Sequence, residues 1–497
     1  MSFDARKSLI RFSQDENDAW TVDDAMKGIS IMGGTGSGKT TASGKALALK
    51  FLKEGWGGIV LCAKTDEADN WEEYCKEAGR ELDLIRFTKG SPIVFNAIDY
   101  EMKRAGKGAG ETQNITNIFM NIFRMGNRIA QEGDTKEERF WDTALKRCLN
   151  RIIDLIKIAG EDLSYRNMVK ILSTSNDVDV ADIGKAVVES EKGGLDQYKE
   201  EKDFCLYCLV KAYFNVKDLE AGDEKSNAYD MAVDYFTHSF KSMGKRTRSV
   251  VIESFMGLAE PFLSGLLREH FSGVTNITPE LTYTEQRIIL LDFPIKEFLD
   301  AGIIAQSVFK LMFQQSIERR DVRLYPTPVF LWADEAQYFI NPYDQIFLTT
   351  ARSSRTSTVY LSQNISNYMA VMGSGSDAKA RVDSLMGNLS TKVFHANSDA
   401  ETNEYASRLI GMEIINLAGA SVNRDVYLGV ATAKSEQISS QYLPQVQPKA
   451  FTTLRSGGPL NNYKVDSIIT VSGRKWASGR NFIPTTFTQS FAKINQT

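Results

Sequence analysis

The sequence has few of the residues that mark several large classes of proteins. Its five cysteines are too few and too irregularly placed for a disulfide framework, which favours a reducing compartment, by default the cytoplasm. The segment Met1–Trp20 is polar and has no apolar stretch like that of a signal peptide. No run of about 18 apolar residues occurs in the chain, so we expect no membrane span of its own.

The chain also lacks a strong charge of either sign. It has 59 Lys and Arg against 63 Asp and Glu, a net charge of −4, which gives no global attraction to DNA or to an anionic membrane. A nucleic-acid site would therefore have to be local. With 42% hydrophobic and 25% charged residues, the 497-residue chain is typical of a folded soluble protein and unlike a disordered chain or a coiled coil. The length allows about two to four domains.

The first hundred residues alternate between expected strands and helices. Short apolar runs at 28–32 and 57–62 predict buried strands, and each is followed by a helical pattern, at 41–54 and at 70–79. This alternation is typical of βαβ units and predicts a parallel sheet with helices on both faces.

The alternation stops between about 101 and 279, where apolar residues recur at helical spacing, and then returns with expected strands at 287–292, 329–333 and 358–362. Beyond about 440 the pattern becomes β-rich, and seven Lys and Arg accompany one Asp. We therefore predict an α/β protein: a parallel-sheet core covered by helices on both faces, with an inserted all-α domain and a basic, β-rich C-terminal tail. The expected parts are 1–104 (lead-in and first part of the core), 105–280 (insertion), 281–440 (second part of the core) and 441–497 (tail).

A glycine-rich motif follows the first expected core strand. Gly33–Thr40 reads GGTGSGKT and fits the P-loop pattern G-x-x-x-x-G-K-[ST] between a strand and a helix. In such a loop the backbone N–H groups surround the phosphates, here with Lys39 reaching the β- and γ-phosphates and the Thr40 hydroxyl binding Mg²⁺. The residues expected to contact ATP are Gly33, Gly34, Thr35, Gly36, Ser37, Gly38, Lys39, Thr40 and Thr41.

A second motif ends the expected strand at 329–333. The apolar run continues into Asp334 and Glu335, as in a Walker B element. We expect Asp334 to hold the Mg²⁺ together with Thr40, and Glu335 to polarise the attacking water. Without a P-loop nearby, the same two acids would also suit a plain helix N-cap.

Three further polar residues are candidates for the catalytic site. Gln363 ends the next expected strand, so its amide should reach the same carboxyl edge of the sheet and suits a sensor of the γ-phosphate or of water. Arg352 and Arg355 lie between these strands, and either could act as an arginine finger toward a neighbouring subunit. Exposed surface roles remain the alternative for all three residues.

With these motifs in place, the chain resembles the HerA/FtsK class of ring translocases, and most of all the cytoplasmic part of the conjugative coupling proteins of type IV secretion (TraG/TraD type). The resemblance covers most of the chain. It rests on the P-loop, the helical insertion, the spacing of Arg352 eleven residues before Gln363, and four short segments: Phe95-Asn96-Ala97, Ala333-Asp334-Glu335-Ala336, Asn388 to Phe394 and Asp399-Ala400-Glu401-Thr402.

The resemblance implies a homohexameric ring whose lumen holds DNA, with Arg352 as the finger acting in trans and Gln363 as the sensor. Coupling proteins usually carry N-terminal transmembrane helices, which are not expected here. Lys392 also stands where many relatives have Arg. We therefore expect a cytoplasmic protein that reaches the inner membrane only through partners.

The sequence leads to one main functional hypothesis and two alternatives. The main hypothesis is an ATP-driven DNA translocase that uses ATP and Mg²⁺ and has a RecA-like P-loop NTPase core with the inserted all-α domain and the β-rich C-terminal tail. The first alternative is an ATPase adaptor that delivers protein substrates to a membrane secretion complex. The second is a nucleotide-gated scaffold for a partner such as a nuclease. Dependence of ATP hydrolysis on DNA separates the first hypothesis from the others.

Overall fold

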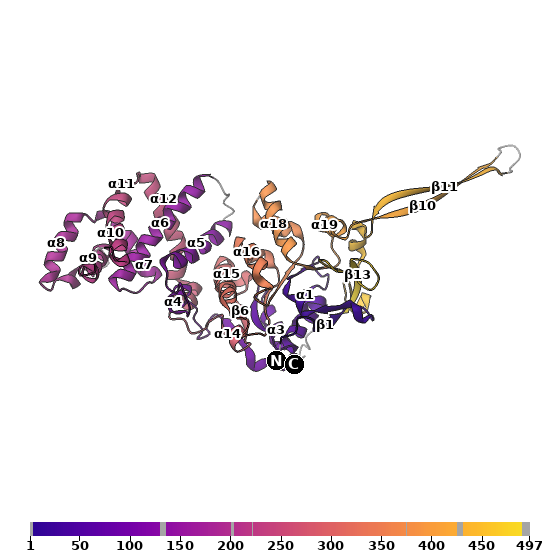
Figure 1. Cartoon of the computed structure of the whole chain (residues 1–497), viewed down its shortest axis with the longest axis horizontal. Helices are drawn as coiled ribbons and strands as arrows, with labels where there is room; N and C mark the ends of the chain where they lie inside the picture. Colours follow the sequence, from indigo (N-terminus) through magenta and orange to yellow (C-terminus); the bar gives the residue numbers. More distant parts are fainter. Residues whose placement is uncertain are drawn as a thin grey trace.

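A computed structural model describes residues 3–129, 136–199, 203–220, 222–373, 375–424 and 431–489. Its centre is a nine-stranded sheet with the strand order β13-β12-β9-β3-β8-β7-β4-β6-β5 (Figure 1). The strands are β3 (Ile29–Met32), β4 (Gly57–Leu61), β5 (Leu84–Thr88), β6 (Ile288–Asp292), β7 (Val329–Ala333), β8 (Thr356–Ser362), β9 (Thr391–Phe394), β12 (Lys464–Val471) and β13 (Phe482–Thr488).

The seven strands from β9 to β5 in this order are parallel, as the alternating sequence pattern predicted. Every residue of β3, β4, β6, β7 and β8 is buried, which is the pattern of parallel strands covered on both faces. Because successive side chains point to opposite faces, Ile59 and Leu61 join one hydrophobic core and Val60 joins the other.

Helices cover both faces of the sheet. On one face Phe51 and Trp71, from α2 (Lys45–Lys53) and α3 (Glu67–Ala78), pack with Phe330 of β7. On the other face α15 (Ile295–Arg319) and α16 (Pro342–Ala351) contribute to the larger core. The remaining helices of this part are α1 (Val22–Met26), α4 (Ala97–Lys103), α14 (Leu281–Thr284), α17 (Ile365–Met372), α18 (Gly375–Asn388) and α19 (Ala400–Ile410). The predicted α/β P-loop core is confirmed.

A separate lobe of helices is inserted between β5 and β6, on the left in Figure 1. It consists of α5 (Thr112–Ile129), α6 (Lys136–Ala159), α7 (Tyr165–Thr174), α8 (Val180–Glu191), α9 (Phe204–Val216), α10 (Glu224–Asp234), α11 (Phe240–Ser242), α12 (Lys245–Ala259) and α13 (Gly265–Phe271). Helix α6 packs against α5, α9, α10 and α12. Its buried residues, such as Leu149, belong to the same hydrophobic cluster as α15, so the lobe shares its core with one face of the sheet.

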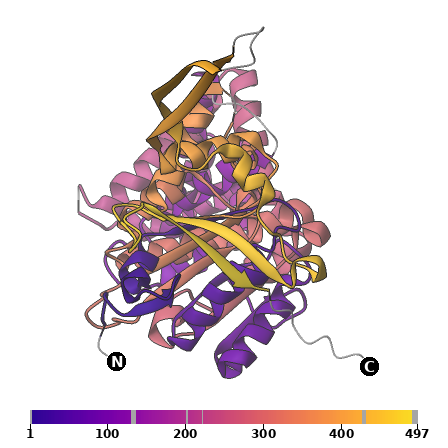
Figure 2. The same ribbon diagram turned by 90° about the vertical axis from the view of Figure 1, so that its right-hand side faces the viewer.

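The C-terminal part of the chain continues the central sheet. Strand β12 pairs antiparallel with β9, and β13 pairs antiparallel with β12, at the edge that faces the viewer in Figure 2. Before them, β10 (Met412–Arg424) and β11 (Ala431–Pro444) form a long hairpin that projects away from the sheet and crosses the boundary predicted at 440 (Figure 1). The four-part division of the chain stays a prediction, and residues 490–497 of the basic tail lie outside the described residues.

Two smaller features complete the fold. The lead-in contains the short strands β1 (Ser8–Arg11) and β2 (Ala19–Thr21), which pair with each other. Among the described helices, none is by itself long and apolar enough to cross a membrane, although Lys245–Leu263 and Gly265–Phe271, which meet at 73°, reach that length and composition as a bent pair. All five cysteines are buried and unbridged.

Candidate active site

The P-loop begins where β3 ends, at the carboxyl edge of the parallel strands. Gly34 N donates a hydrogen bond to the carbonyl of Ala396, 2.9 Å away, which joins the loop to the end of β9. Gly36 and Gly38 have φ angles of 74° and 81°, a region that residues with a Cβ rarely adopt. The hydroxyl of Ser37 is buried without a hydrogen-bond partner among the described residues. A phosphate held by this loop would supply the missing partner.

The helix after the P-loop presents the two residues expected to hold the nucleotide. The chain winds through a π-helical turn, Thr40–Gly44, before α2 begins. Thr40 Oγ1 donates to Asp334 Oδ2 at 3.0 Å. Lys39, whose side chain is 7% exposed, places Nζ 3.8 Å from Glu335 Oε1. The two sequence motifs, about 300 residues apart, therefore meet in one site as predicted.

Glu335 lies in a strained backbone conformation at the end of β7. Its φ and ψ angles are 49° and 48°, a left-handed conformation that is uncommon for residues other than glycine. The Glu335 N–H donates to Asp334 Oδ1 at 2.9 Å, and Gln337 Nε2 donates to Glu335 Oε2 at 2.9 Å. Ser362 Oγ in turn donates to Gln337 Oε1 at 3.0 Å. Ser362 of β8 thus fixes Gln337 by a hydrogen bond, and Gln337 fixes one oxygen of the Glu335 carboxylate.

Lys64 was not among the residues expected at this site. This residue follows β4, the neighbour of β7 in the sheet, and its Nζ lies 2.9 Å from Asp334 Oδ2 and 3.2 Å from Glu335 Oε1. Burial alone would lower the pKa of Lys64, but the charges of these two carboxylates outweigh it and raise the pKa. A lysine directly after a buried parallel strand was the available signal, because the carboxyl ends of such strands meet at one edge.

The surrounding cations keep Glu335 ionised. Burial would raise the pKa of Glu335, but the hydrogen bond from Gln337 and the charges of Lys39 and Lys64 lower it below its ordinary value. Glu67, on α3, shows the opposite behaviour: burial and the nearby Asp334 charge raise its pKa well above its ordinary value. Glu335 is therefore a carboxylate near neutral pH, which suits a group that orients or polarises a water.

Gln363 connects the catalytic glutamate with the P-loop. Its Nε2 lies 3.4 Å from Glu335 Oε1, and its Oε1 lies 3.4 Å from the hydroxyl of Thr35. Both contacts are long for hydrogen bonds, so this amide can turn toward a ligand at small cost. The structure places Gln363 between the two motifs, and its role as a γ-phosphate sensor stays a prediction.

The oxygen atoms at the centre of the site suit Mg²⁺. The ion prefers an octahedral shell of oxygen atoms and usually keeps several waters beside one or two protein ligands and the substrate phosphates. The Thr40 hydroxyl and the Asp334 carboxylate, 3.0 Å apart, supply such a pair. No group of three or more His, Cys, Asp or Glu that could hold a metal occurs among the described residues, which leaves the Thr40 and Asp334 pair as the candidate.

The two candidate arginine fingers lie at the opposite edge of the sheet. Both precede β8, which starts at Thr356 and runs toward the P-loop edge. The side chain of Arg352 is 61% exposed, and its one ion pair among the described residues joins Nη2 to Asp23 Oδ1 at 2.9 Å. The Arg355 guanidinium lies 3.8 Å from the ring centroid of Phe3 and donates to the carbonyl of Pro326. Neither reaches the nucleotide site of its own chain.

A buried histidine contacts the helical turn that follows the P-loop. His395 Nε2 lies 2.7 Å from the Ser43 hydroxyl, and its Nδ1 lies 2.9 Å from the backbone carbonyl of Asp466 in β12. Because a carbonyl can only accept, Nδ1 carries the proton and Nε2 accepts from Ser43. Burial lowers the pKa of His395 to about 4. The histidine thus joins β9, β12 and the first helical turn after the P-loop.

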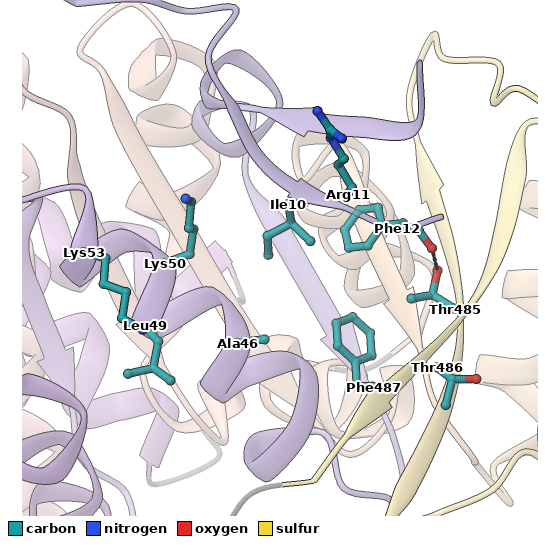
Figure 3. Close-up of a pocket in the computed structure, with 10 residues that line it drawn as sticks. All are labelled: Ile10, Arg11, Phe12, Ala46, Leu49, Lys50, Lys53, Thr485, Thr486 and Phe487. Atoms are coloured by element: carbon teal, nitrogen blue, oxygen red, sulfur yellow. Dashed lines mark hydrogen bonds between the residues drawn. The ribbon is translucent and has the colours of Figure 1, made fainter. Parts of the chain in front are cut away.

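Outside the phosphate site, one side of α2 from Ala46 to Lys53 borders a pocket of about 410 Å³ (Figure 3). Its walls come from β1, α2 and β13, and combine the cations Arg11, Lys50 and Lys53 with the rings of Phe12 and Phe487. Lys50 is paired with Glu54 at 3.1 Å, and Arg11 with Glu16 at 3.4 Å. With two of its three cations paired, the pocket carries little uncompensated charge.

The fold and the site define a P-loop protein in which Lys39, Asp334 and Glu335 meet at the carboxyl edge of a RecA-like sheet. Residues 328–454 match the family model described as the TraM recognition site of TraD and TraG. This segment includes Asp334, Glu335, Arg352 and Gln363. No curated protein matches the chain.

Solved structures of a conjugative coupling protein have the same fold. TrwBdeltaN70, a bacterial conjugative coupling protein in an unbound form, aligns with a TM-score of 0.58 and 13% identity over 100% of this chain and 91% of its own. The plasmid coupling protein TrwB in complex with ADP and Mg²⁺ aligns with a TM-score of 0.55 and 13% identity, over 99% and 91%. TrwB with a non-hydrolysable ATP analogue gives 0.54 and 12%, over 100% and 98%. The resemblance of this chain to the coupling-protein type of P-loop ATPase is confirmed.

Proposed function

We propose that this protein is an ATP-driven DNA translocase that works as a ring of identical subunits. The observation that carries the proposal is the division of the catalytic groups between two edges of the sheet. Lys39, Glu335 and Gln363 gather at the carboxyl edge, whereas Arg352 lies exposed beyond the amino ends of the strands. A ring in which one subunit's amino edge faces the next subunit's nucleotide would complete each site.

In this mechanism the chain's own residues position the substrate and the water. The P-loop N–H groups and Lys39 bind the phosphates of ATP, and Thr40 and Asp334 hold the Mg²⁺, which neutralises charge on the phosphate oxygens. Glu335 accepts a hydrogen bond from the attacking water and orients it toward the γ-phosphate. Gln363 contacts the γ-phosphate or the water, and this contact depends on whether the bond between the β- and γ-phosphates is intact. Arg352 of the neighbouring subunit stabilises the charge of the transition state.

The partners follow from the same arrangement. We infer a homohexamer with DNA in its lumen, and a protein partner from a membrane secretion complex or a nuclease system that supplies the location and the target. Residues 328–454, which match a partner-recognition family model, are a candidate for such a protein contact. The protein would then act in the cytoplasm, and at the inner membrane when a partner recruits it.

The test is a steady-state ATPase assay with and without single-stranded and duplex DNA, with the oligomer sized in the same buffer and Glu335→Gln as the inactive reference. Strong stimulation by DNA in a hexamer-sized species, absent from the variant, would support the translocase. Hydrolysis that is indifferent to DNA would contradict it and favour the protein-delivery adaptor. Nucleotide binding with near-zero turnover would favour the nucleotide-gated scaffold.

A further inference from the structure

The order of the strands fixes the direction in which a nucleotide lies across the site. The carboxylates Asp334 and Glu335 follow β7, which lies two strands to one side of β3 and the P-loop. They mark the γ-phosphate end, because Mg²⁺ and the attacking water act there. Strands β9, β12 and β13 lie on the other side of β3. The nucleoside end of the ligand therefore points toward β12 and β13.

The ends of these two strands that reach the P-loop edge carry a polar side chain beside the nucleotide site. Strand β12 is antiparallel to β9 and β13 is antiparallel to β12, so the start of β12 and the end of β13 lie at the P-loop edge. Gln489 follows β13 directly and donates from Nε2 to the hydroxyl of Thr41 at 2.8 Å. Thr41 is the residue after the P-loop threonine, in the helical turn Thr40–Gly44 that follows the phosphate-binding loop.

Gln489 is held in this place by a tightly folded turn, residues 456–463. The Gln489 side chain accepts from Gly458 N at 2.9 Å, and the Gln489 N–H donates to the carbonyl of Tyr463 at 2.8 Å. At Gly457, with a φ of 82°, a Cβ would collide with the Gln489 carboxamide oxygen. The same turn approaches the P-loop itself, since a Cβ at Gly38 would lie 2.6 Å from Val465 and 3.4 Å from the Ser456 carbonyl.

The amide of Gln489 keeps hydrogen-bonding capacity in reserve. A glutamine amide has two N–H donors and an oxygen with two lone pairs. Its bonds to Thr41 and Gly458 use one donor and one lone pair among the described residues. One N–H and one lone pair remain, in a side chain that is only partly exposed and already fixed next to the P-loop. A donor and an acceptor side by side match the hydroxyls of a ribose and the edge of a base.

We propose that Gln489 and the turn 456–463 form the nucleoside subsite of the nucleotide site, and that Gln489 contacts the ribose or the base of the bound nucleotide. The inference rests on the proposed nucleotide function and adds to it a specificity residue from the C-terminal strand. Gln489 acts on the affinity for the nucleoside part alone, because Lys39 and the P-loop N–H groups bind the phosphates without it.

The experiment compares a nucleotide with its phosphate chain alone. The affinities of the full-length protein for ATP and for inorganic tripolyphosphate, both with Mg²⁺, are measured by titration calorimetry. We expect Gln489→Ala to weaken ATP binding about fivefold to tenfold, the effect of one or two hydrogen bonds, with tripolyphosphate binding unchanged. Gln489→Met, which keeps the length and removes the hydrogen bonds, should show the same loss. Gln197→Ala, an exposed glutamine in the helical lobe, is the matched control and should leave both affinities unchanged.

Two further ligands identify which part of the nucleoside is contacted. A smaller loss for 2′-deoxyATP than for ATP in Gln489→Ala would assign the contact to the ribose, and a smaller loss for GTP would assign it to the base. Equal weakening of ATP and tripolyphosphate would overturn the inference, because Gln489 would then only support the P-loop through Thr41. Unchanged ATP affinity, or full affinity in Gln489→Met, would also overturn it. Failure of the wild-type protein to bind either ligand would instead overturn the nucleotide site itself.

Discussion

The two edges of the central sheet carry functional side chains in opposite ways. At the carboxyl edge, Lys39, Lys64, Asp334 and Glu335 are all held by one another within one chain. At the amino edge, Arg352 has a 61% exposed side chain and a single ion pair among the described residues, with Asp23. The carboxyl edge is a nearly complete site. Arg352, at the amino edge, has no such site within reach among the described residues of its own chain.

The difference between the carboxyl edge and the amino edge has an energetic basis. Buried charges are stable only when their partners are in place, so removing one charge from the carboxyl edge leaves another uncompensated. An exposed pair such as Arg352 with Asp23 contributes about 0 to 1 kcal/mol to stability, so Arg352 can leave it for a stronger partner at small cost. Asp23 also keeps Lys27, 2.7 Å away, as a second cation. This contrast fits our proposal that the carboxyl edge serves the chain itself and that Arg352 at the amino edge serves a neighbouring subunit.

The largest effect is expected at the carboxyl edge, from Glu335→Gln. The amide cannot act as a base toward water, so we expect kcat for ATP hydrolysis to fall about 10³-fold while ATP binding is retained. Steady-state hydrolysis and a binding titration on the same sample measure the two quantities. Glu73→Gln, on the exposed side of α3, is the control. A fall of less than about tenfold would show that another group activates the water.

Arg352→Ala tests whether the amino edge serves a second subunit. We expect kcat to fall about 10³-fold, the lower end of the range for an arginine finger, with unchanged binding of ATP to the isolated subunit. Arg355→Ala should have a small effect because Arg355 is tied to Phe3 and Pro326 of its own chain. Mixing is the decisive measurement. Arg352→Ala and Glu335→Gln subunits should regain activity together, since some interfaces then combine an intact Glu335 with an intact Arg352. If the two inactive variants stay inactive when mixed, Arg352 does not act on the site of a neighbouring subunit, and the proposed division of work between the two edges is wrong.

Lys64→Met is expected to have a moderate effect that shows in the pH profile. Lys64 is one of the charges that lower the pKa of Glu335, so its removal raises that pKa. Activity that needs ionised Glu335 is lost as the pH falls through this pKa, and the acid limb of kcat should therefore move to higher pH. At neutral pH we expect kcat to fall by up to about 10²-fold, the size of the effect that a misplaced catalytic group can have. Lys76→Met, on the exposed face of α3, is the control, and an unmoved acid limb would contradict the role.

The sequence predicted the parts of the fold and the site that lie in continuous segments. Gly33–Thr40 and the strand ending in Asp334 and Glu335 carry their own signals, because the spacing of the glycines and the buried run define the local structure. Buried parallel strands also put their carboxyl ends at one edge, so the meeting of these motifs with Gln363 followed from the pattern alone.

The missed residues are those whose role depends on which strands are neighbours. Lys64 meets Asp334 only because β4 pairs with β7, and His395 meets Ser43 only because β9 pairs with β3. The sequence of the C-terminal segment predicted β-structure, but it did not indicate that β12 pairs with β9 and so continues the central sheet. For the same reason nothing in the sequence near Gln489 indicated a contact with Thr41, 448 residues away.

A further expected effect concerns the stability of the carboxyl edge against acid and leaves the chemistry of the site aside. Burial lowers the pKa of His395 to about 4 from 6.5, so between these values the unfolded chain binds a proton that the folded chain excludes. The free energy of unfolding therefore falls as the pH drops from about 6.5 toward 4, by up to about 3 kcal/mol from this residue. His395→Gln should show a smaller fall in urea unfolding between pH 7 and pH 5, although it is less stable at pH 7 because it loses the bond with Ser43. His238→Gln, an exposed histidine in the helical lobe, should keep the full dependence of the wild type. If both variants lose the same amount of stability on acidification, the acid sensitivity belongs to the carboxylates, and His395 contributes no more than packing under the P-loop.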